Sequence, residues 1–318
     1  HEVDPSAVMA FFYYVLFVMM VSDAAYGLLT VVGSAFALRK FPDMELKMRK
    51  TLRMFLFCGI STTVWGVLFG SYFGDAIPVI AQTFFHTEIT VPALWFEPLD
   101  DPMRLLIFSF GVGVAHLFTG LGVQFYQLAK QRKYADALYD VVFWYLLVGG
   151  LIVVLLSTEI FQNIAELPFV VPGPVAAVAG VLAGIGAVGI LFTAGRESRN
   201  PVKRFLKGLY GLYGVSSYVS DILSYSRLLA LGLATSVIST VFNQLGAMLG
   251  GGVVGAIFFA VVFLIGHSMN MAINLLGAYV HTNRLQFVEF FGKFYEGGGR
   301  AYAPFAANTK HFQIKEEK

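Results

Sequence analysis

Long apolar runs separated by short charged loops dominate the chain. About 20 helical residues cross a hydrocarbon core of about 30 Å, so each run is a candidate transmembrane helix. The predicted spans are residues 7–21, 24–38, 52–72, 105–128, 139–156, 175–193, 209–249 and 253–294. The first two are short and separated by Ser22-Asp23, so they form either two oblique helices or one broken hairpin. The pattern predicts an all-α, polytopic membrane protein with about eight transmembrane helices.

The last two apolar runs are about 40 residues long, which corresponds to about 60 Å as helix. They must tilt steeply or project into the cytoplasm. Gly250-Gly251-Gly252 joins them as a tight turn, which predicts a long antiparallel hairpin over residues 201–296. Within a single membrane domain, residues 1–200 then form a six-helix scaffold, and residues 297–318 form a cytoplasmic tail. The loop 73–103 contains four prolines, which disfavour one continuous helix, and we expect it to be an ordered external cap.

Basic residues alternate from loop to loop. They gather in residues 39–53, 130–133 and 196–207, whereas residues 73–103, 157–174 and 250–252 contain no Lys or Arg. The positive-inside rule therefore places the basic loops, and both ends of the chain, on the cytoplasmic side.

Composition narrows the function classes. Charged residues make up 13% and hydrophobic residues 57% of the chain, against about 25% charged in soluble domains. A net charge of +2 gives no reason to expect a nucleic-acid partner. Cys58 is the single cysteine and is interpreted as a small buried hydrophobe, so we expect no disulfide, metal or redox cofactor. The chain has no Gly-x-x-x-x-Gly-Lys-Ser/Thr sequence, so we expect no ATP site or catalytic residue in it.

Arg227 lies deep in an apolar helix. An arginine at mid-membrane costs at least roughly 2.5 to 3.5 kcal/mol on insertion scales, so its default interpretation is a functional charge site. The helix that contains it also carries Ser217, Ser220 and Ser224 at helical spacing, with Asp221 alongside.

A second polar face runs along the last predicted helix. Steps of three and four residues place seven positions on one side, of which five are strongly polar: His267, Asn270, Asn274, Gly277, His281, Arg284 and Val288. Hydrogen bonds between helices would explain such a face, and an aqueous ion path would too. The length of the face and the arginine near its end favour the ion path.

Folding the hairpin at Gly251 places Arg227 roughly level with Asn274, and Arg284 closer to Ser217 and Asp221. This geometry suggests two offset polar half-paths, an outer one along His267, Asn270 and Asn274 and a cytoplasmic one along Ser217, Ser220, Asp221 and Ser224. Arg227 stands between them. Arg284 either extends to the cytoplasmic interface or pairs with Asp221.

Four segments carry a family resemblance. They are EVDPSAVMAFFYYVLFVMMVSDAAYG at residues 2–27, FGSYFGD at 69–75, SDILSYSRLLALGLATSVI at 220–238, and HSMNMAINLLGAYVHTNRLQFVEFFGKFYEGGGRAYAPF at 267–305. Together they resemble the membrane half of subunit a of V/A-type rotary ATPases, called subunit I in archaea and bacteria.

The resemblance implies an ion-conducting stator beside a rotating ring of c/K/L-type proteolipid subunits, each with a membrane-buried carboxylate. Arg227 aligns with the essential arginine of the family and Arg284 with a second one. A cytosolic N-terminal domain upstream of this chain and peripheral stalk subunits are further implied partners. Thr235 and Asn274 stand where eukaryotic relatives usually have histidine and glutamate, so the resemblance implies a bacterial or archaeal plasma membrane.

Two other classes remain open from the residues. A secondary transporter or channel could use Arg227 to bind an anion, and it would enclose a ligand pocket. A passive membrane anchor would have no use for the polar faces. The stator interpretation predicts instead an open face on the long hairpin. The sequence leaves open proton or sodium as the ion, the direction of operation and the number of ring subunits.

Overall fold

The computed structural model describes residues 4–165, 170–196, 200–295 and 297, and every regular element within them is helical. This confirms the predicted all-α class. The elements are α1 (Ser6–Val21), α2 (Ala24–Lys40), α3 (Leu46–Phe69), α4 (Ala76–Phe85), α5 (Pro102–Lys130), α6 (Tyr134–Ala137), the π-helical turn η1 (Leu138–Val142), α7 (Phe143–Ser157), α8 (Glu159–Ala165), α9 (Gly173–Thr193), α10 (Pro201–Ser224), α11 (Ser226–Ala247), α12 (Val253–Arg284), a second π-helical turn η2 (Leu285–Phe290) and the 3-10 turn η3 (Phe291–Lys293). Apart from Gly297, the predicted tail lies outside the described residues.

Six helical segments in the described part are long and apolar enough to cross a membrane. They are Leu46–Phe69, Pro102–Lys130, Tyr134–Ser157, Gly173–Thr193, Pro201–Ala247 and Val253–Lys293. The expected count of eight is not confirmed, because the first two predicted spans form helices of 16 and 17 residues. Both are shorter than the roughly 20 residues that a perpendicular crossing needs.

Helix α1 forms the centre of the molecule. Every residue of 16–21 is at most 1% exposed. This half of α1 is apolar on all sides and is buried where α1 packs against α3, α11 and α12, whereas Phe11 in the first half is 65% exposed. The predicted break follows, because Ser22 adopts a left-handed conformation with φ of 42° and ends the helix.

Asp23 begins α2 and joins it to the loop after α3. Its Oδ1 accepts hydrogen bonds from the backbone N–H groups of Ala25, Tyr26 and Phe73, and its Oδ2 accepts from the Ser71 hydroxyl and the Gly74 N–H. The side chain is buried. Five donors therefore compensate the desolvation of one carboxylate. The bonds fix the turn between α1 and α2 against the segment that leads into α4.

The loop predicted as a cap contains α4 and an aromatic segment. Trp95 stacks on Phe69 with ring centroids 6.0 Å apart, and Phe96 meets the same ring edge-on at 5.2 Å. The backbone N–H of Trp95 also donates to the carbonyl of Leu68 at 3.0 Å. The segment is thus packed onto the end of α3, while its place outside the membrane stays a prediction.

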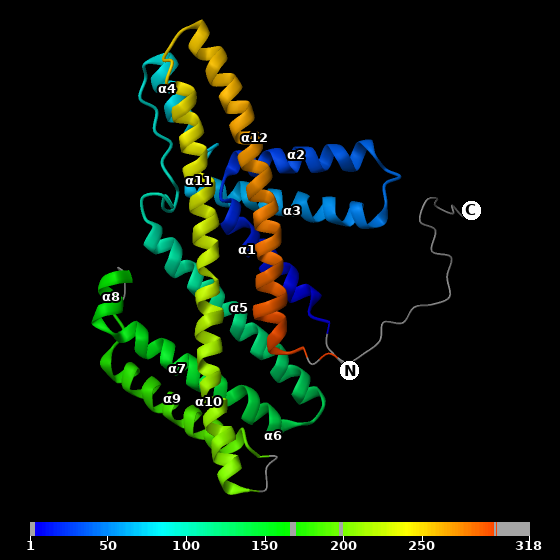
Figure 1. Cartoon of the computed structure of the whole chain (residues 1–318), viewed down its shortest axis with the longest axis vertical. Helices are drawn as coiled ribbons and strands as arrows, with labels where there is room; N and C mark the ends of the chain where they lie inside the picture. Colours follow the sequence, from blue (N-terminus) through cyan, green and yellow to red (C-terminus); the bar gives the residue numbers. More distant parts are fainter. Residues whose placement is uncertain (1–3, 166–169, 197–199, 296, 298–318) are drawn as a thin grey trace, which may run out of the picture.

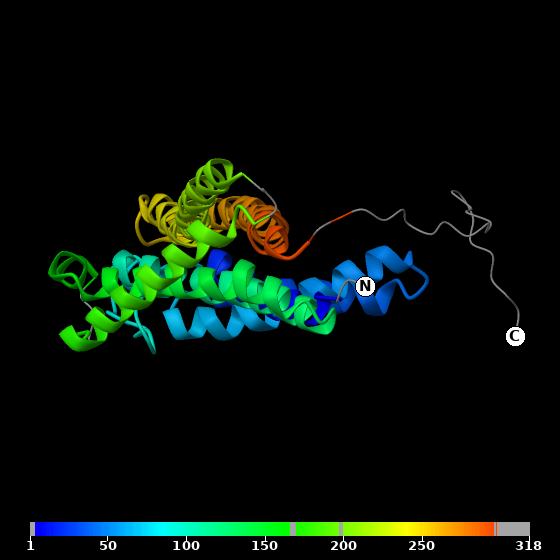
Figure 2. The same ribbon diagram turned by 90° about the horizontal axis from the view of Figure 1, so that it is seen from below.

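The helices form two layers that cross. Helices α2 and α3 make one antiparallel hairpin and α7 and α9 make another; α11 and α12 run across the first, and α10, which leads into α11, runs across the second (Figure 1). Seen from below, α11 and α12 lie to one side of the layer that contains α2, α3 and α5 (Figure 2). Gly250 and Gly252, with φ of 70° and 127°, make the turn between α11 and α12, a conformation that disfavours side chains.

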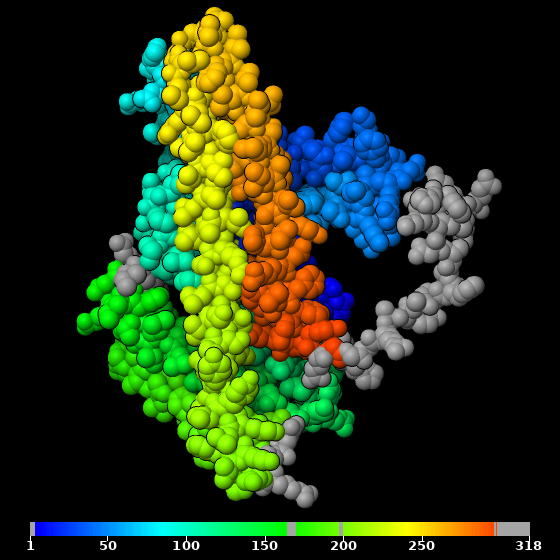
Figure 3. Space-filling model, viewed as in Figure 1, coloured from blue at the N-terminus to red at the C-terminus, as the bar shows by residue number. Residues whose placement is uncertain are grey.

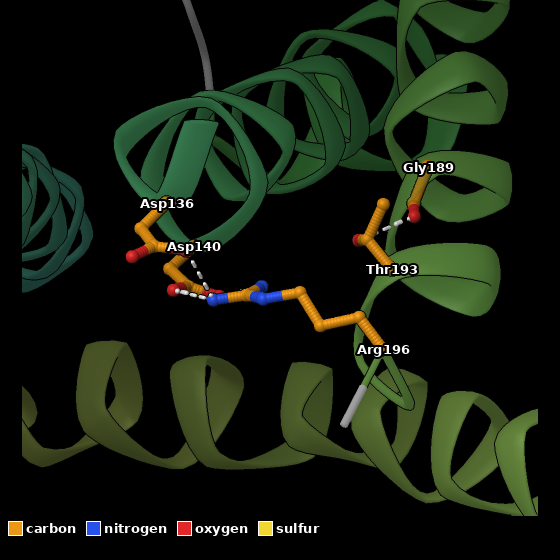
Figure 4. A network of polar contacts seen from close by, with 5 residues as sticks. All are labelled: Asp136, Asp140, Gly189, Thr193 and Arg196. Atoms are coloured by element: carbon orange, nitrogen blue, oxygen red, sulfur yellow. Dashed lines mark hydrogen bonds and ion pairs between the residues drawn. The ribbon is translucent and has the colours of Figure 1, made fainter. Parts of the chain in front are cut away.

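A cluster of charged side chains joins the end of α9 to α6 and η1. Arg196 donates to Asp136 at 2.9 Å and to both carboxylate oxygens of Asp140 at 3.1 and 2.9 Å (Figure 4). Thr193, one turn earlier, bonds to the carbonyl of Gly189. The cluster fixes the end of α9, which leads towards α10.

Candidate charge site in the long hairpin

Both arms of the long hairpin depart from α-helical geometry near Arg227. Helix α10 ends at Ser224 and α11 begins at Ser226, with Tyr225 in the break. On the other arm, α12 ends at Arg284 and continues as the π-helical turn η2. Such turns inside helices are frequent at functional sites.

The π-helical turn changes which residues face the interior. A regular helix would carry the polar face from Arg284 to Val288, as the sequence pattern predicts. In the structure Val288 is 61% exposed, and the neighbouring Glu289 is 2% exposed. A π-helical turn has more residues per turn than an α-helix, so the inward face passes to the next residue. Glu289 therefore joins the site, although sequence reasoning did not identify it.

Arg227 and Glu289 form the charge pair of the site. Nη1 of Arg227 lies 3.6 Å from Oε1 of Glu289, and the two side chains are 25% and 3% exposed. Within the described residues, Nη1 of Arg227 and Oε2 of Glu289 are buried and have no hydrogen-bond partner. The pair is an ion pair without a hydrogen bond, and it leaves hydrogen-bonding capacity on both groups.

His281 and Arg284 approach the same pair from α12. His281 is partly buried, and its Nδ1 has no hydrogen-bond partner in the described part of the chain. Arg284 is exposed, and none of the ion pairs found among the described residues involves it. Arg227 and Arg284 both interact electrostatically with His281 and with Glu289, so the four side chains share one site.

The break at Tyr225 is held from α5. The Tyr225 hydroxyl lies 2.8 Å from Nδ1 of His116. The His116 ring is stacked between Phe12 and Phe290, with ring centroids 4.3 and 4.4 Å away. Three helices therefore position the backbone that immediately precedes Arg227.

The outer polar residues form a closed hydrogen-bond network. His267 lies with Nε2 2.9 Å from Oδ1 of Asn243 and with Nδ1 2.6 Å from the Tyr26 hydroxyl. The Asn243 amide nitrogen donates to the Phe73 carbonyl and the Asp75 carboxylate. Its Oδ1 consequently accepts from Nε2–H of His267, which leaves Nδ1 to accept the Tyr26 proton. The network thereby assigns the histidine tautomer.

Asn270 and Asn274 extend this network inward. The Asn270 amide donates to the Tyr26 oxygen at 3.0 Å, the Ser239 hydroxyl at 2.9 Å and the Thr235 carbonyl at 3.1 Å. The Asn274 amide donates to both the carbonyl and the side-chain oxygen of Asn270. The predicted outer residues are thus brought together. Sequence reasoning gave no role in the path to Tyr26, Ser239 or Asn243, because they lie on other faces or in another helix.

The predicted cytoplasmic residues are more open. Ser217 and Ser220 are exposed, and the Ser224 hydroxyl donates to the Ser220 carbonyl at 3.1 Å. Asp221 pairs with Lys293 at 2.5 Å, so the carboxylate considered as a partner for Arg284 is engaged by another residue.

The register of the hairpin differs from the simple fold at Gly251. Leu231 faces Gly277, and Arg227 lies beside Glu289 instead of level with Asn274. The two arms are therefore slipped relative to a symmetric hairpin. The π-helical turn adds to the slip beyond Arg284, because it packs more residues into the same length.

These features define a class. The chain is an all-helical membrane protein with a buried charge site on a long hairpin, and no three His, Cys, Asp or Glu side chains of the described residues gather to hold a metal ion. Residues 215–307, which include this site, match the family described as V-type ATPase 116kDa subunit.

Relatives match over nearly the whole chain. A-type ATP synthase subunit I of Pyrococcus horikoshii is 33% identical over 100% of this chain and 45% of the relative. The same subunit of Methanocaldococcus jannaschii is 30% identical over 98% of the chain and 46% of the relative. V-type ATP synthase subunit I of Chlamydia pneumoniae is 24% identical over 95% and 50%.

Residues 215–307 are thus similar to this family, and the chain as a whole matches the C-terminal part of the prokaryotic subunit I. It spans about half the length of these relatives.

Proposed function

We propose that this chain is the ion-conducting stator of a prokaryotic V/A-type rotary ATPase, with Arg227 exchanging charge with a carboxylate on a proteolipid ring. One observation carries the proposal. Arg227 is a quarter exposed on the long hairpin, with Nη1 buried beside Glu289, so part of its side chain stays open to a partner at the surface. A partly exposed arginine can donate hydrogen bonds to a carboxylate of a second protein.

The hairpin offers a surface for such a partner. In Figure 3 α10, α11 and α12 run along the front of the molecule from end to end with no other described segment across them. Large apolar side chains stand out from these helices, among them Tyr210, Tyr213, Leu223, Val237, Val241, Leu276 and Val280. An anion transporter would instead enclose Arg227 in a pocket. The uncovered face supports the stator.

The chemistry follows from the surroundings of the ring carboxyl. A carboxyl that faces lipid is neutral, because desolvation disfavours its charged form. Within about 4 to 6 Å of Arg227 the charged form is favoured, and the carboxyl releases its proton to water in one half-path. Moving on, it takes a proton from the other half-path before it meets lipid again. Arg227, which keeps its charge at any cellular pH, separates the two and prevents a direct leak.

Two groups of side chains would form the half-paths. His267, Asn270 and Asn274 line the outer one, with Asp75 and Asn243 at its external end. Ser217, Ser220, Asp221 and Ser224 line the cytoplasmic one, in the orientation that the basic loops predict. ATP chemistry would belong to other subunits of the complex.

Ion uptake into liposomes that contain the assembled complex tests the proposal. With Arg227→Ala we expect ATP-driven uptake to fall at least about 100-fold, while assembly and ATP hydrolysis persist. Without the positive charge of Arg227, the ring carboxyl is no longer favoured in its charged form and does not release its proton. Arg49→Ala, an exposed arginine of α3, is the matched control and should leave uptake unchanged. Normal uptake by an intact Arg227→Ala complex would overturn the proposal.

A further inference from the structure

Glu289 occupies an unusual position for an acid. Its side chain is 3% exposed, and the π-helical turn η2 directs it towards Arg227 on the facing arm. A buried carboxylate without a compensating charge or hydrogen bonds is unfavourable. Here Arg227, which the proposed function requires for another purpose, supplies the paired charge, and Ser224 and Arg284 add to the compensation.

We propose that Glu289 is the exchangeable counter-charge of Arg227. It neutralises the guanidinium while no ring carboxylate is present, and it competes with that carboxylate when one arrives. Glu289 is thus a positioning residue, since it acts through Arg227. The proposal rests on the proposed function of Arg227 and adds to it the group that releases the ring carboxylate.

The geometry supports exchange over a permanent lock. The 3.6 Å separation of Nη1 and Oε1 is longer than a charge-assisted hydrogen bond, which spans about 2.7 to 2.9 Å. Nη1 of Arg227 and Oε2 of Glu289 keep unused hydrogen-bonding capacity in the described structure. By contrast, Nζ of Lys293 lies 2.5 Å from Oδ2 of Asp221, in a second ion pair between the two arms of the hairpin. The hairpin therefore contains one ion pair that is hydrogen-bonded and one, Arg227 with Glu289, that is not.

The other charged and titratable groups around the pair do not supply this counter-charge. From α12, Arg284 is positive and exposed, and His281 is neutral or positive. From α10 and η3, Asp221 and Lys293 neutralise each other. Tyr225, in the break of the facing arm, bonds to His116 of α5. Of the two acids, Asp221 and Glu289, it is Glu289 that is paired directly with Arg227.

Removal of the Glu289 charge should strengthen the hold of Arg227 on a ring carboxylate. The ring carboxyl would then release its proton to water at lower pH and leave Arg227 more slowly. A nearby charge shifts such equilibria by about 1 to 3 pH units when both groups are close and desolvated. We therefore expect a lower pH of half-maximal transport together with a lower maximal rate.

The test uses the assembled complex in liposomes, with ATP-driven ion uptake measured across pH. For Glu289→Gln we expect the half-maximal pH to fall by about one unit and the maximal rate to fall several-fold. Glu289→Asp keeps the charge and should restore the wild-type pH profile. Glu159→Gln, the same change at an exposed position in α8, is the control and should not shift the profile.

A purely structural Glu289 would give a different result. Its replacement would then lower the rate by one factor at every pH, and Glu289→Asp would not restore the profile. Either result overturns the proposal. If Arg227→Ala transports normally, the proposed function itself has failed; if Arg227→Ala is inactive but Glu289→Gln keeps the wild-type profile, only the counter-charge has failed.

A second measurement covers poor assembly of the single variants. Arg227→Ala should leave Glu289 as a buried unpaired charge and lower the thermal stability of the complex. Adding Glu289→Gln to Arg227→Ala should then recover part of the loss, as expected for two paired groups. A double variant whose loss equals the sum of the single losses contradicts the pairing.

Discussion

At the scale of single residues, the free-energy cost of burying a charged side chain identifies functional groups better than the periodicity of polar positions does. Arg227 could be found from the sequence, because an arginine within an apolar helix is rare and costly and therefore indicates a functional site. Glu289 could not, since its inward direction depends on a π-helical turn that the pattern of residues 284–290 does not announce. A glutamate within the apolar stretch QFVEFF was the available signal.

Asp23 gives a prediction that separates its two oxygens. Asp23→Asn keeps an acceptor at one oxygen and places an N–H₂ group at the other. In the observed orientation, the Ser71 hydroxyl and the Gly74 N–H would then face a donor. If the amide flips, the three backbone donors at Oδ1 lose their acceptor instead.

Either orientation leaves buried donors unpaired, so we expect Asp23→Asn to lower the free energy of unfolding by about 2 to 4 kcal/mol. The apparent melting temperature of the purified full-length protein measures the change. Glu88→Gln, the corresponding change from carboxylate to amide at an exposed loop position, is the control and should change it little. An unchanged melting temperature for Asp23→Asn would show that water satisfies these donors.

At the scale of elements, apolar length predicted most of the helices, and all six spanning segments lie at predicted positions. The same criterion leaves the predicted span at α1 unconfirmed, because a helix packed in protein and one packed in lipid are equally apolar. Its enclosure by α3, α11 and α12 depends on tertiary packing, which the apolar length of residues 7–21 does not encode. The slip between the two arms of the long hairpin also could not be predicted by counting residues on either side of Gly251.

Helix α2 offers a matched test of its packing on α3. A Cβ atom at Gly27 would lie 2.5 Å from the backbone nitrogen of Thr63 and 2.9 Å from the carbonyl of Gly59, whereas one at Gly33 would meet nothing within 4 Å. Small residues allow such close approach of helices in membranes. We expect Gly27→Ala to destabilise the protein by about 1 to 3 kcal/mol, because backbone atoms must move.

Gly33→Ala is the same change in the same helix, and it should alter stability by less than about 1 kcal/mol. Thermal unfolding of the two variants side by side measures the difference. Equal stability of Gly27→Ala and Gly33→Ala would contradict the close contact of α2 and α3.

At the scale of the whole molecule, the two crossing layers have different roles. The scaffold around α1 fixes one side of the α11–α12 hairpin through Tyr26 and the turn at Asp23, and the other side is left uncovered. The site is consequently anchored from behind and open in front. This arrangement suits a subunit that holds still while a partner moves past it.

The central claim is that this open face meets a ring carboxylate beside Arg227, and disulfide cross-linking in the assembled complex tests it most directly. Leu223, 55% exposed just before the helix break, is changed to Cys, and the buried Cys58 is changed to Ala. The ring subunit carries a second cysteine next to its carboxylate. Phe36→Cys, 61% exposed on α2, is the control.

We expect oxidation to join Leu223→Cys to the ring and to stop ATP-driven ion uptake, and a reductant to restore it, while Phe36→Cys forms no adduct with the ring. An adduct with Phe36→Cys but none with Leu223→Cys, in a complex that transports normally, would contradict the account.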